Sequence, residues 1–150
     1  MRCRFLTAAC VSLVVCGAPC AGDDAKKELK SLEGSWEYAS ILVEGKKVVF
    51  PEGKRLRLVI KGDTYTLELY GKRYERGTLA VDPAKQPKAL DMTATEGKGK
   101  GDKKLGIYEI KGDQLRACLA LPGMPRPTTF AADPGSNRLL GEYRRVKAKP

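Results

Sequence analysis

The chain has 150 residues, a net charge of +10, five cysteines and no histidine. This length suits a single domain, and the lack of histidine excludes Ser-His-Asp and Cys-His catalysis and zinc bound by histidine. The sequence contains no Asp-x-Asp-x-Asp calcium loop and no Cys-x-x-Cys metal pair, so we expect no metal and no other cofactor.

Residues 1–22 have the pattern of a secretion signal. Arg2 and Arg4 precede an apolar run, and small residues follow it as far as Gly22. The apolar run is shorter than the ~20 residues of a membrane-spanning helix, and no later stretch approaches that length. We therefore expect an exported protein, periplasmic or extracellular, with no transmembrane segment and one mature domain over residues 23–150.

Two further observations concern the cysteines. A lipid anchor on Cys16 or Cys20 would need a small residue just before the cysteine, and Val15 and Pro19 stand there instead. Four cysteines lie in the expected signal, which leaves Cys118 alone and excludes an internal disulfide. We expect Cys118 to be a half-buried, inert thiol in a strand; the alternative is intermolecular pairing or redox sensing.

The elements predicted after residue 22 are one short helix and a series of short strands. The helix spans 23–32, where Asp23 or Asp24 can cap it and apolar residues recur at helical spacing. Turns bearing Gly, Asp or Pro then interrupt the chain about every ten residues, as in antiparallel sandwiches and barrels. The predicted strands are 36–43, 55–61, 64–69, 74–81, 90–95, 105–110, 115–121, 128–131 and 139–146, with a brief extended piece at 48–50.

Strict alternation gives several of these strands one apolar face. Consecutive short turns pair neighbouring strands, which favours an up-and-down barrel of about eight or nine strands. A barrel of this size either holds one small ligand or is filled by its own side chains. The residues that we expect inside, as candidate ligand contacts, are Leu56, Leu58, Ile60, Tyr65, Leu67, Leu69, Leu90 and Met92.

Two loops have a distinctive composition. Residues 96–103 are rich in Gly and Lys, and we expect a mobile loop there; the alternative is a backbone cradle for an anion. Residues 122–127 contain three prolines, and we expect a rigid connector between strands rather than a wall of the barrel mouth.

Trp36 is the only tryptophan, and we expect it in the core with its N–H bonded to a partner. A cation from the last strand can lie on its ring. The candidates are Arg144 and Arg145, which alternate in direction, so that only one of them points inward.

Gly34-Ser35-Trp36 after a short helix resembles the Gly-x-Trp that opens the first strand of lipocalins, and Arg144 or Arg145 would match the arginine that lipocalins stack on that tryptophan. A longer series of segments is similar to the lipocalin-like domain of unknown function that is abundant in planctomycete bacteria. The segments are Leu32 to Trp36, Ile60 to Tyr65, Gly106 to Glu109, Leu115 to Cys118 and Pro125 to Phe130. The resemblance implies an exported lipocalin-like barrel, and it implies neither a reaction nor a ligand.

We therefore expect an all-β, antiparallel lipocalin-like barrel that is monomeric and non-enzymatic and binds a small apolar or amphipathic ligand. The alternative is a surface-interaction module. Residues 23–150 carry a net charge of +8, because two of the 28 basic residues and none of the 18 acidic ones lie in residues 1–22. A basic face could bind an acidic polymer, anionic lipid or an envelope protein, whereas export argues against nucleic acid. An enzyme, such as a hydrolase without histidine, would need Tyr65, Tyr74 or Tyr108 in a pocket.

Overall fold

The computed structural model of the chain describes residues 21–51 and 55–147. Most of the expected signal, residues 1–20, lies outside the described residues. One helix and nine strands form in the described part. They are α1 (Ala21–Leu32), β1 (Gly34–Val43), β2 (Lys46–Lys47), β3 (Leu56–Lys61), β4 (Thr64–Leu69), β5 (Lys72–Asp82), β6 (Lys88–Gly97), β7 (Lys103–Lys111), β8 (Gln114–Ala120) and β9 (Arg138–Arg145).

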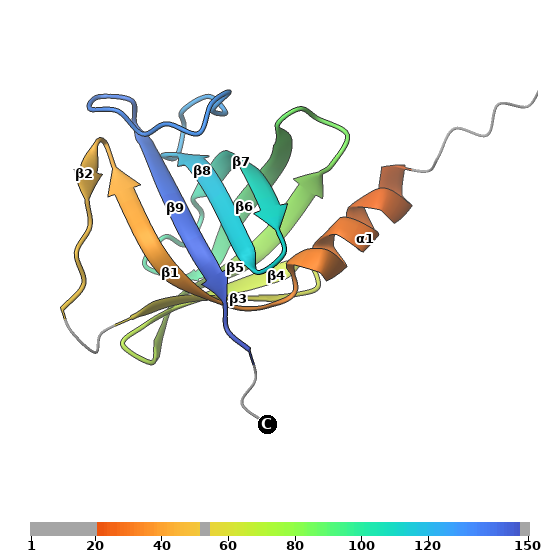
Figure 1. The fold of residues 1–150 in the computed structure, drawn as a ribbon, viewed down its shortest axis with the longest axis horizontal. Helices are drawn as coiled ribbons and strands as arrows, with labels where there is room; N and C mark the ends of the chain where they lie inside the picture. Colours follow the sequence, from red (N-terminus) through yellow and green to blue (C-terminus); the bar gives the residue numbers. More distant parts are fainter. Residues whose placement is uncertain (1–20, 52–54, 148–150) are drawn as a thin grey trace, which may run out of the picture.

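The strands form a closed up-and-down barrel (Figure 1). From β3 to β9, each strand pairs antiparallel with the next one in the chain, β1 pairs with β3, and β9 returns to pair with β1. Trp36 shows the closure, because its register partners are Leu58 of β3 and Arg145 of β9. β2 is a two-residue strand added to the end of β1. The predicted all-β antiparallel barrel of eight or nine strands is confirmed.

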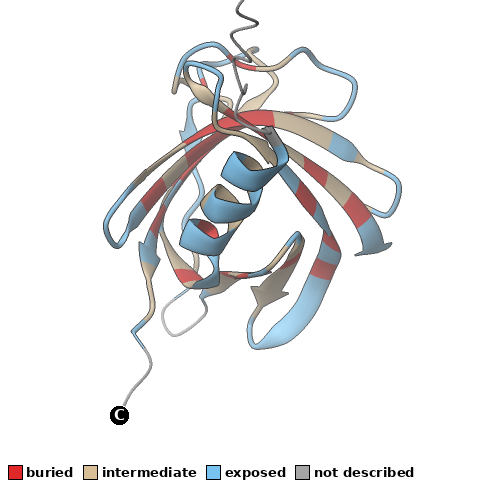
Figure 2. Ribbon diagram, turned by 90° about the vertical axis from the view of Figure 1, so that its right-hand side faces the viewer, coloured by how far each residue is buried: buried red, intermediate tan, exposed pale blue. Residues whose placement is uncertain are grey.

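The helix α1 lies across one end of the barrel (Figure 2). Asp23 and Asp24 occupy its first turn, where carboxylates interact favourably with the helix dipole. Leu29 and Leu32 pack on the barrel core. The Trp36 indole N–H donates to the carbonyl of Leu32 at 2.8 Å, which binds the last turn of the helix to the first strand. The opposite end of the barrel, where the β1–β2, β4–β5 and β6–β7 turns lie, is called the far end.

A second, smaller apolar cluster lies on the outside of the barrel. Ile107, Cys118 and Leu140 point outward from β7, β8 and β9 and pack with Ala132. The connection between β8 and β9, residues 121–137, folds over them and is called the strap. The small cluster exists because these outward positions are apolar and need a cover.

The strap corrects one predicted strand. Residues 128–131 were expected to be extended and paired, and they form no strand. Their carbonyls bond to side chains of β8 instead: the Phe130 carbonyl accepts from Arg116 at 3.3 Å, and the Ala131 carbonyl accepts from the Cys118 thiol at 3.4 Å. Pro127 just before them is buried and has no N–H to give to a ladder.

The structure adds two details to the predicted segments. The short strand next to residues 48–50 is β2 at Lys46–Lys47. In the Gly/Lys-rich segment, residues 98–102 form the turn between β6 and β7. Within that turn, the Gly101 and Asp102 amides donate to the carbonyls of Ala94 and Gly99 at 2.9 and 2.8 Å.

Candidate functional site at the far end of the barrel

The eight residues predicted to line the barrel divide into three groups. Leu58, Ile60, Tyr65, Leu90 and Met92 are buried in the main core. Leu67 is partly buried and packs against that core. Leu56 and Leu69, which are register partners at the far end of β3 and β4, are only half-buried.

The barrel interior contains two small hollows rather than one large cavity. The inner hollow, next to Leu32 of the helix, measures about 30 Å³. The outer hollow measures about 80 Å³ and lies toward the far end. The two share Leu58, Met92, Leu119 and Tyr143 in their walls. The outer hollow is lined by Tyr38, Leu58, Leu67, Met92, Lys104, Leu119, Ala120, Leu121, Leu139 and Tyr143.

A pair of tyrosines forms one side of the outer hollow. The rings of Tyr38 and Tyr143 are tilted against each other with centroids 4.1 Å apart, and the Tyr143 hydroxyl donates to the Tyr38 oxygen at 3.0 Å. Burial raises the pKa of Tyr143 to about 12. Burial, with a smaller contribution from Tyr143, raises the pKa of Tyr38 well above its ordinary value. Both phenols therefore keep their protons at neutral pH.

A buried ion pair lies beside the same hollow. Among the described residues, the charged side chain that is buried is Glu75 of β5, which is 3% exposed. Its carboxylate accepts a hydrogen bond from the Tyr65 hydroxyl at 2.7 Å and lies 3.3 Å from the Lys104 ammonium. Burial and this carboxylate together raise the pKa of Tyr65. A buried carboxylate needs such partners, because an unpaired charge in the interior costs several kcal/mol, in the range of ~3–5.

The β6–β7 turn covers this ion pair. A side chain at Gly99 would place its Cβ 2.4 Å from a Glu75 carboxylate oxygen, and one at Gly97 would meet the backbone of Tyr74 and Glu75. Gly97 also has a φ of +94°, a conformation that favours glycine. Gly97 and Gly99 thus allow close backbone contact over Glu75.

A larger groove of about 420 Å³ lies at the rim of the far end, between β1 and residues 47–51, 55 and 56. This rim groove meets the outer hollow at Tyr38, which lines both spaces. Glu37 at its edge is paired with Arg55 at 2.7 Å, and the Arg55 and Arg57 guanidinium groups lower the pKa of Glu37. The rim groove is lined by Glu37, Tyr38, Ala39, Lys47, Val48, Val49, Phe50, Pro51, Arg55 and Leu56.

At the helix end, Arg145 is the arginine that stacks on Trp36, and its guanidinium carbon is 4.1 Å from the ring centroid. The same group donates to the carbonyls of Glu33 and Ser31. Arg144 points outward and is exposed. Gly34, which precedes the tryptophan by two residues, has a φ of +128°, and a Cβ there would approach the Arg145 guanidinium at 3.0 Å. Gly34, Trp36 and Arg145 close the helix end, and none of the three lines either hollow.

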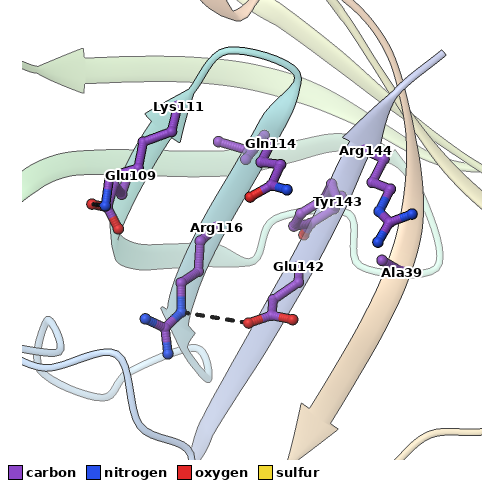
Figure 3. Close-up of a pocket in the computed structure, with 9 residues that line it drawn as sticks. Ala39, Glu109, Lys111, Gln114, Arg116, Glu142, Tyr143 and Arg144 are labelled. Carbon is purple, nitrogen blue, oxygen red and sulfur yellow. Dashed lines mark ion pairs between the residues drawn. The ribbon is translucent and has the colours of Figure 1, made fainter.

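A polar groove of about 230 Å³ lies on the outer surface of β7, β8 and β9 (Figure 3). Its charged side chains alternate in sign: Lys111 pairs with Glu109, and Arg116 lies 3.8 Å from Glu142. These pairs are exposed and stand side by side on a sheet face, as solvated strand residues do. This outer-face groove therefore presents a mixed rather than a basic surface.

Two of the three tyrosines considered for catalysis, Tyr65 and Tyr108, line the inner hollow together, and each donates to a carboxylate. Tyr74 is exposed on the outside of β5, whereas Tyr65 and Tyr108 are buried and donate to Glu75 and Glu28. Cys118 is fully buried beneath the strap, deeper than expected, and burial raises the pKa of its thiol. In the described residues, no group of three or more Cys, Asp or Glu side chains is placed to hold a metal ion.

Residues 122–127 behave as the expected connector. Arg126 anchors them to the outside of β6 and β7, because its guanidinium donates to the carbonyls of Leu90 and Gly106 at 2.9 and 2.6 Å and pairs with Asp91 at 2.6 Å. The rigid connector is thus attached outside the barrel wall, and only Leu121 before it reaches the outer hollow.

Sequence reasoning missed Tyr38, Glu75, Lys104 and Tyr143. Glu75 has the same strand parity as Leu79, which would have placed its side chain inside the barrel. Lys104 likewise alternates in phase with Tyr108, which would have placed its side chain inside the barrel. It stands at the end of the lysine-rich residues 98–104, whose composition indicates a solvent-exposed turn.

No protein-family model matches this chain, and neither a curated protein nor a solved structure matches it. In the part of the chain that the structure describes, α1 lacks the length and the apolar character of a membrane span.

Proposed function

We propose that this chain is an exported, non-enzymatic binding protein of the lipocalin-like kind, which takes a small apolar or amphipathic molecule at the far end of its barrel. The observation that carries the proposal is the outer hollow. Its wall is apolar except for Tyr38, Tyr143 and Lys104, and an apolar space with a few polar groups is the usual character of a small-molecule site.

The dimensions of the site limit the ligand. A dry cavity of ~150 Å³ holds benzene, so the outer hollow, at about 80 Å³, accepts only a small apolar group. The rim groove, at about 420 Å³, is within the ~300–1,000 Å³ range of ligand pockets. The ligand that fits both places a small apolar end in the hollow and its remainder against Val48, Phe50 and Leu56 in the groove.

The alternative, a basic surface module, receives less support from the outer face. The outer-face groove carries Glu109 and Glu142 among its basic residues, and these acids pair with Lys111 and Arg116. A polyanion would have to compete with those carboxylates. Salt separates the two functions, because binding to exposed lysines weakens steeply with ionic strength and binding in an apolar hollow changes little.

The test combines ligand identification with a blocked site. We expect native mass spectrometry of the protein purified from its source to show a retained small molecule. Leu139→Trp, which extends an indole into the outer hollow, should remove that mass. Val59→Trp on the outer face of β3 is the matched control and should keep it. A bare mass in the unaltered protein, together with salt-sensitive binding to heparin, would refute the proposal and favour the surface module.

A further inference from the structure

We propose that the far-end site selects neutral ligands that carry one hydrogen-bond acceptor, such as a ketone or ester oxygen, and rejects carboxylates. This inference rests on the proposed function and specifies the chemistry of its ligand. Two groups in the wall of the outer hollow carry it, the Tyr38–Tyr143 pair and the Lys104 ammonium, together with the Glu75 carboxylate that pairs with that ammonium from behind the wall.

The first step is the donor that Tyr38 provides. Its oxygen accepts the hydroxyl proton of Tyr143, and among the described residues its own O–H donates to no partner. A hydroxyl has one proton to donate, and burial keeps the Tyr38 phenol protonated. Tyr38 lines both the outer hollow and the rim groove, so a ligand that passes between the two spaces meets this free donor.

The second step is the capacity left on Lys104. Its ammonium has three N–H donors and lies 3.3 and 3.4 Å from the two oxygens of Glu75. Lys104 lines the outer hollow, and Glu75 does not. The wall of the hollow therefore offers hydrogen-bond donors to a ligand from Tyr38 and from Lys104. The matching ligand group is an acceptor oxygen.

The third step is the charge of the site. The Lys104 charge is already balanced by Glu75, which is 3% exposed and bonded to Tyr65. A ligand carboxylate would bring a second negative charge next to that buried one, and like charges in a desolvated site repel strongly. A cationic ligand would be repelled by the Lys104 ammonium, because Lys104 lines the hollow. A neutral ligand avoids both costs.

The experiment uses three cyclopentane-based probes, cyclopentanone, methylenecyclopentane and cyclopentanecarboxylate, which are larger than the outer hollow and would extend past Tyr38 into the rim groove. Titrations at pH 7 would follow the methyl NMR signals of Leu121 and Leu139, which line the hollow. We expect both neutral probes to bind and the carboxylate to bind at least about 100-fold more weakly than the ketone, as expected when an unpaired charge is buried.

Two variants test the roles of the wall. Tyr38→Phe, made in a Tyr143→Phe protein so that the Tyr143 hydroxyl cannot replace the lost donor, should weaken cyclopentanone by about 5-fold, the equivalent of one neutral hydrogen bond, and leave methylenecyclopentane unchanged. Tyr74→Phe, on the exposed outside of β5, is the matched control and should change neither affinity. Glu75→Gln keeps the shape and removes the balancing charge, so the carboxylate should gain about 10-fold or more and the ketone should change little.

The outcomes separate this inference from the proposed function. If none of the probes shifts the Leu121 or Leu139 signals, both are wrong. If the hydrocarbon binds and Tyr38→Phe leaves the ketone affinity unchanged, the binding function stands and acceptor recognition is refuted. Binding of the carboxylate as tight as that of the ketone in the unaltered protein would refute the selection against anions.

Discussion

Arg145 connects three parts of the chain through one guanidinium group. It lies on the Trp36 ring, donates to the carbonyls of Ser31 in the last turn of α1 and of Glu33 just after it, and approaches Asp113 in the β7–β8 turn at 3.5 Å. A planar group with several N–H donors can make all these contacts at once, which an ammonium cannot. The Trp36 indole adds its own bond to the Leu32 carbonyl, so the helix end is fixed by complementary polar contacts around an apolar ring.

Arg145→Lys should therefore lower the free energy of unfolding by about 2 kcal/mol, the sum of a lost ring contact and at least one lost charged hydrogen bond, discounted for partial exposure. Urea unfolding followed by tryptophan fluorescence measures this change. Arg144→Lys on the exposed face is the control and should change stability by less than about 0.5 kcal/mol. Equal effects of the two substitutions would contradict the role assigned to Arg145.

The strap is the element that the sequence describes least well, and it has a clear structural task. It covers the outward apolar residues of β7, β8 and β9, including Cys118, and Arg126 holds it against β6 and β7. Its stability depends on a few local contacts rather than on a strand ladder, so it should open more readily than the barrel itself.

Opening of the strap can be measured through Cys118. Arg126→Met removes the carbonyl bonds and the ion pair with Asp91, so we expect the thiol to react with a maleimide at least about 10-fold faster, as expected when opening costs over 1.4 kcal/mol less. Met124→Ala, also on the strap but exposed, should leave the rate unchanged. The role of Arg126 as a local anchor of the strap would be refuted if Arg126→Met lowered the free energy of unfolding of the whole protein and Cys118 reacted with the maleimide only at the rate of global unfolding.

The sequence predicts those elements whose residues follow a local rule. Leu58, Ile60, Tyr65, Leu90 and Met92 alternate within regular strands, and they are all buried as the period of two requires. The strap follows no such rule. Its carbonyls at Phe130 and Ala131 accept hydrogen bonds from side chains of β8, and its backbone forms no ladder with that strand. The tyrosine pair at the far end also has no local signal, since Tyr38 and Tyr143 are 105 residues apart and meet only when the barrel closes.

At the scale of the whole molecule, the interior is unusually rich in phenols for its size. Tyr38, Tyr65, Tyr108 and Tyr143 all point into the barrel, and burial is the largest cause of the raised pKa of each. Their neutral forms are favoured in the folded protein, whereas in the unfolded chain they lose protons near pH 10. The contribution of these four tyrosines to the free energy of unfolding is therefore fully present below about pH 10. It is lost as the pH rises toward about 12, the pKa of Tyr143.

We accordingly expect the absorbance of tyrosinate at 295 nm to rise in two stages. The later stage belongs to the four inner phenols and should coincide with the loss of the β-sheet circular dichroism signal above about pH 11. Ionisation of all six tyrosines in one smooth step, with the circular dichroism unchanged, would contradict the burial of the four inner phenols.

The pairing of β1 with β9 has a consequence for biogenesis. The first strand after the helix finds one of its two neighbours only in β9, and just beyond β9 the Val146 amide also donates to the Ser35 carbonyl. A chain synthesised from its amino end must therefore leave this edge of β1 unpaired until β9 has been made. Contacts between such distant residues slow folding, so during that interval holdase chaperones would find their best opportunity to bind this polypeptide.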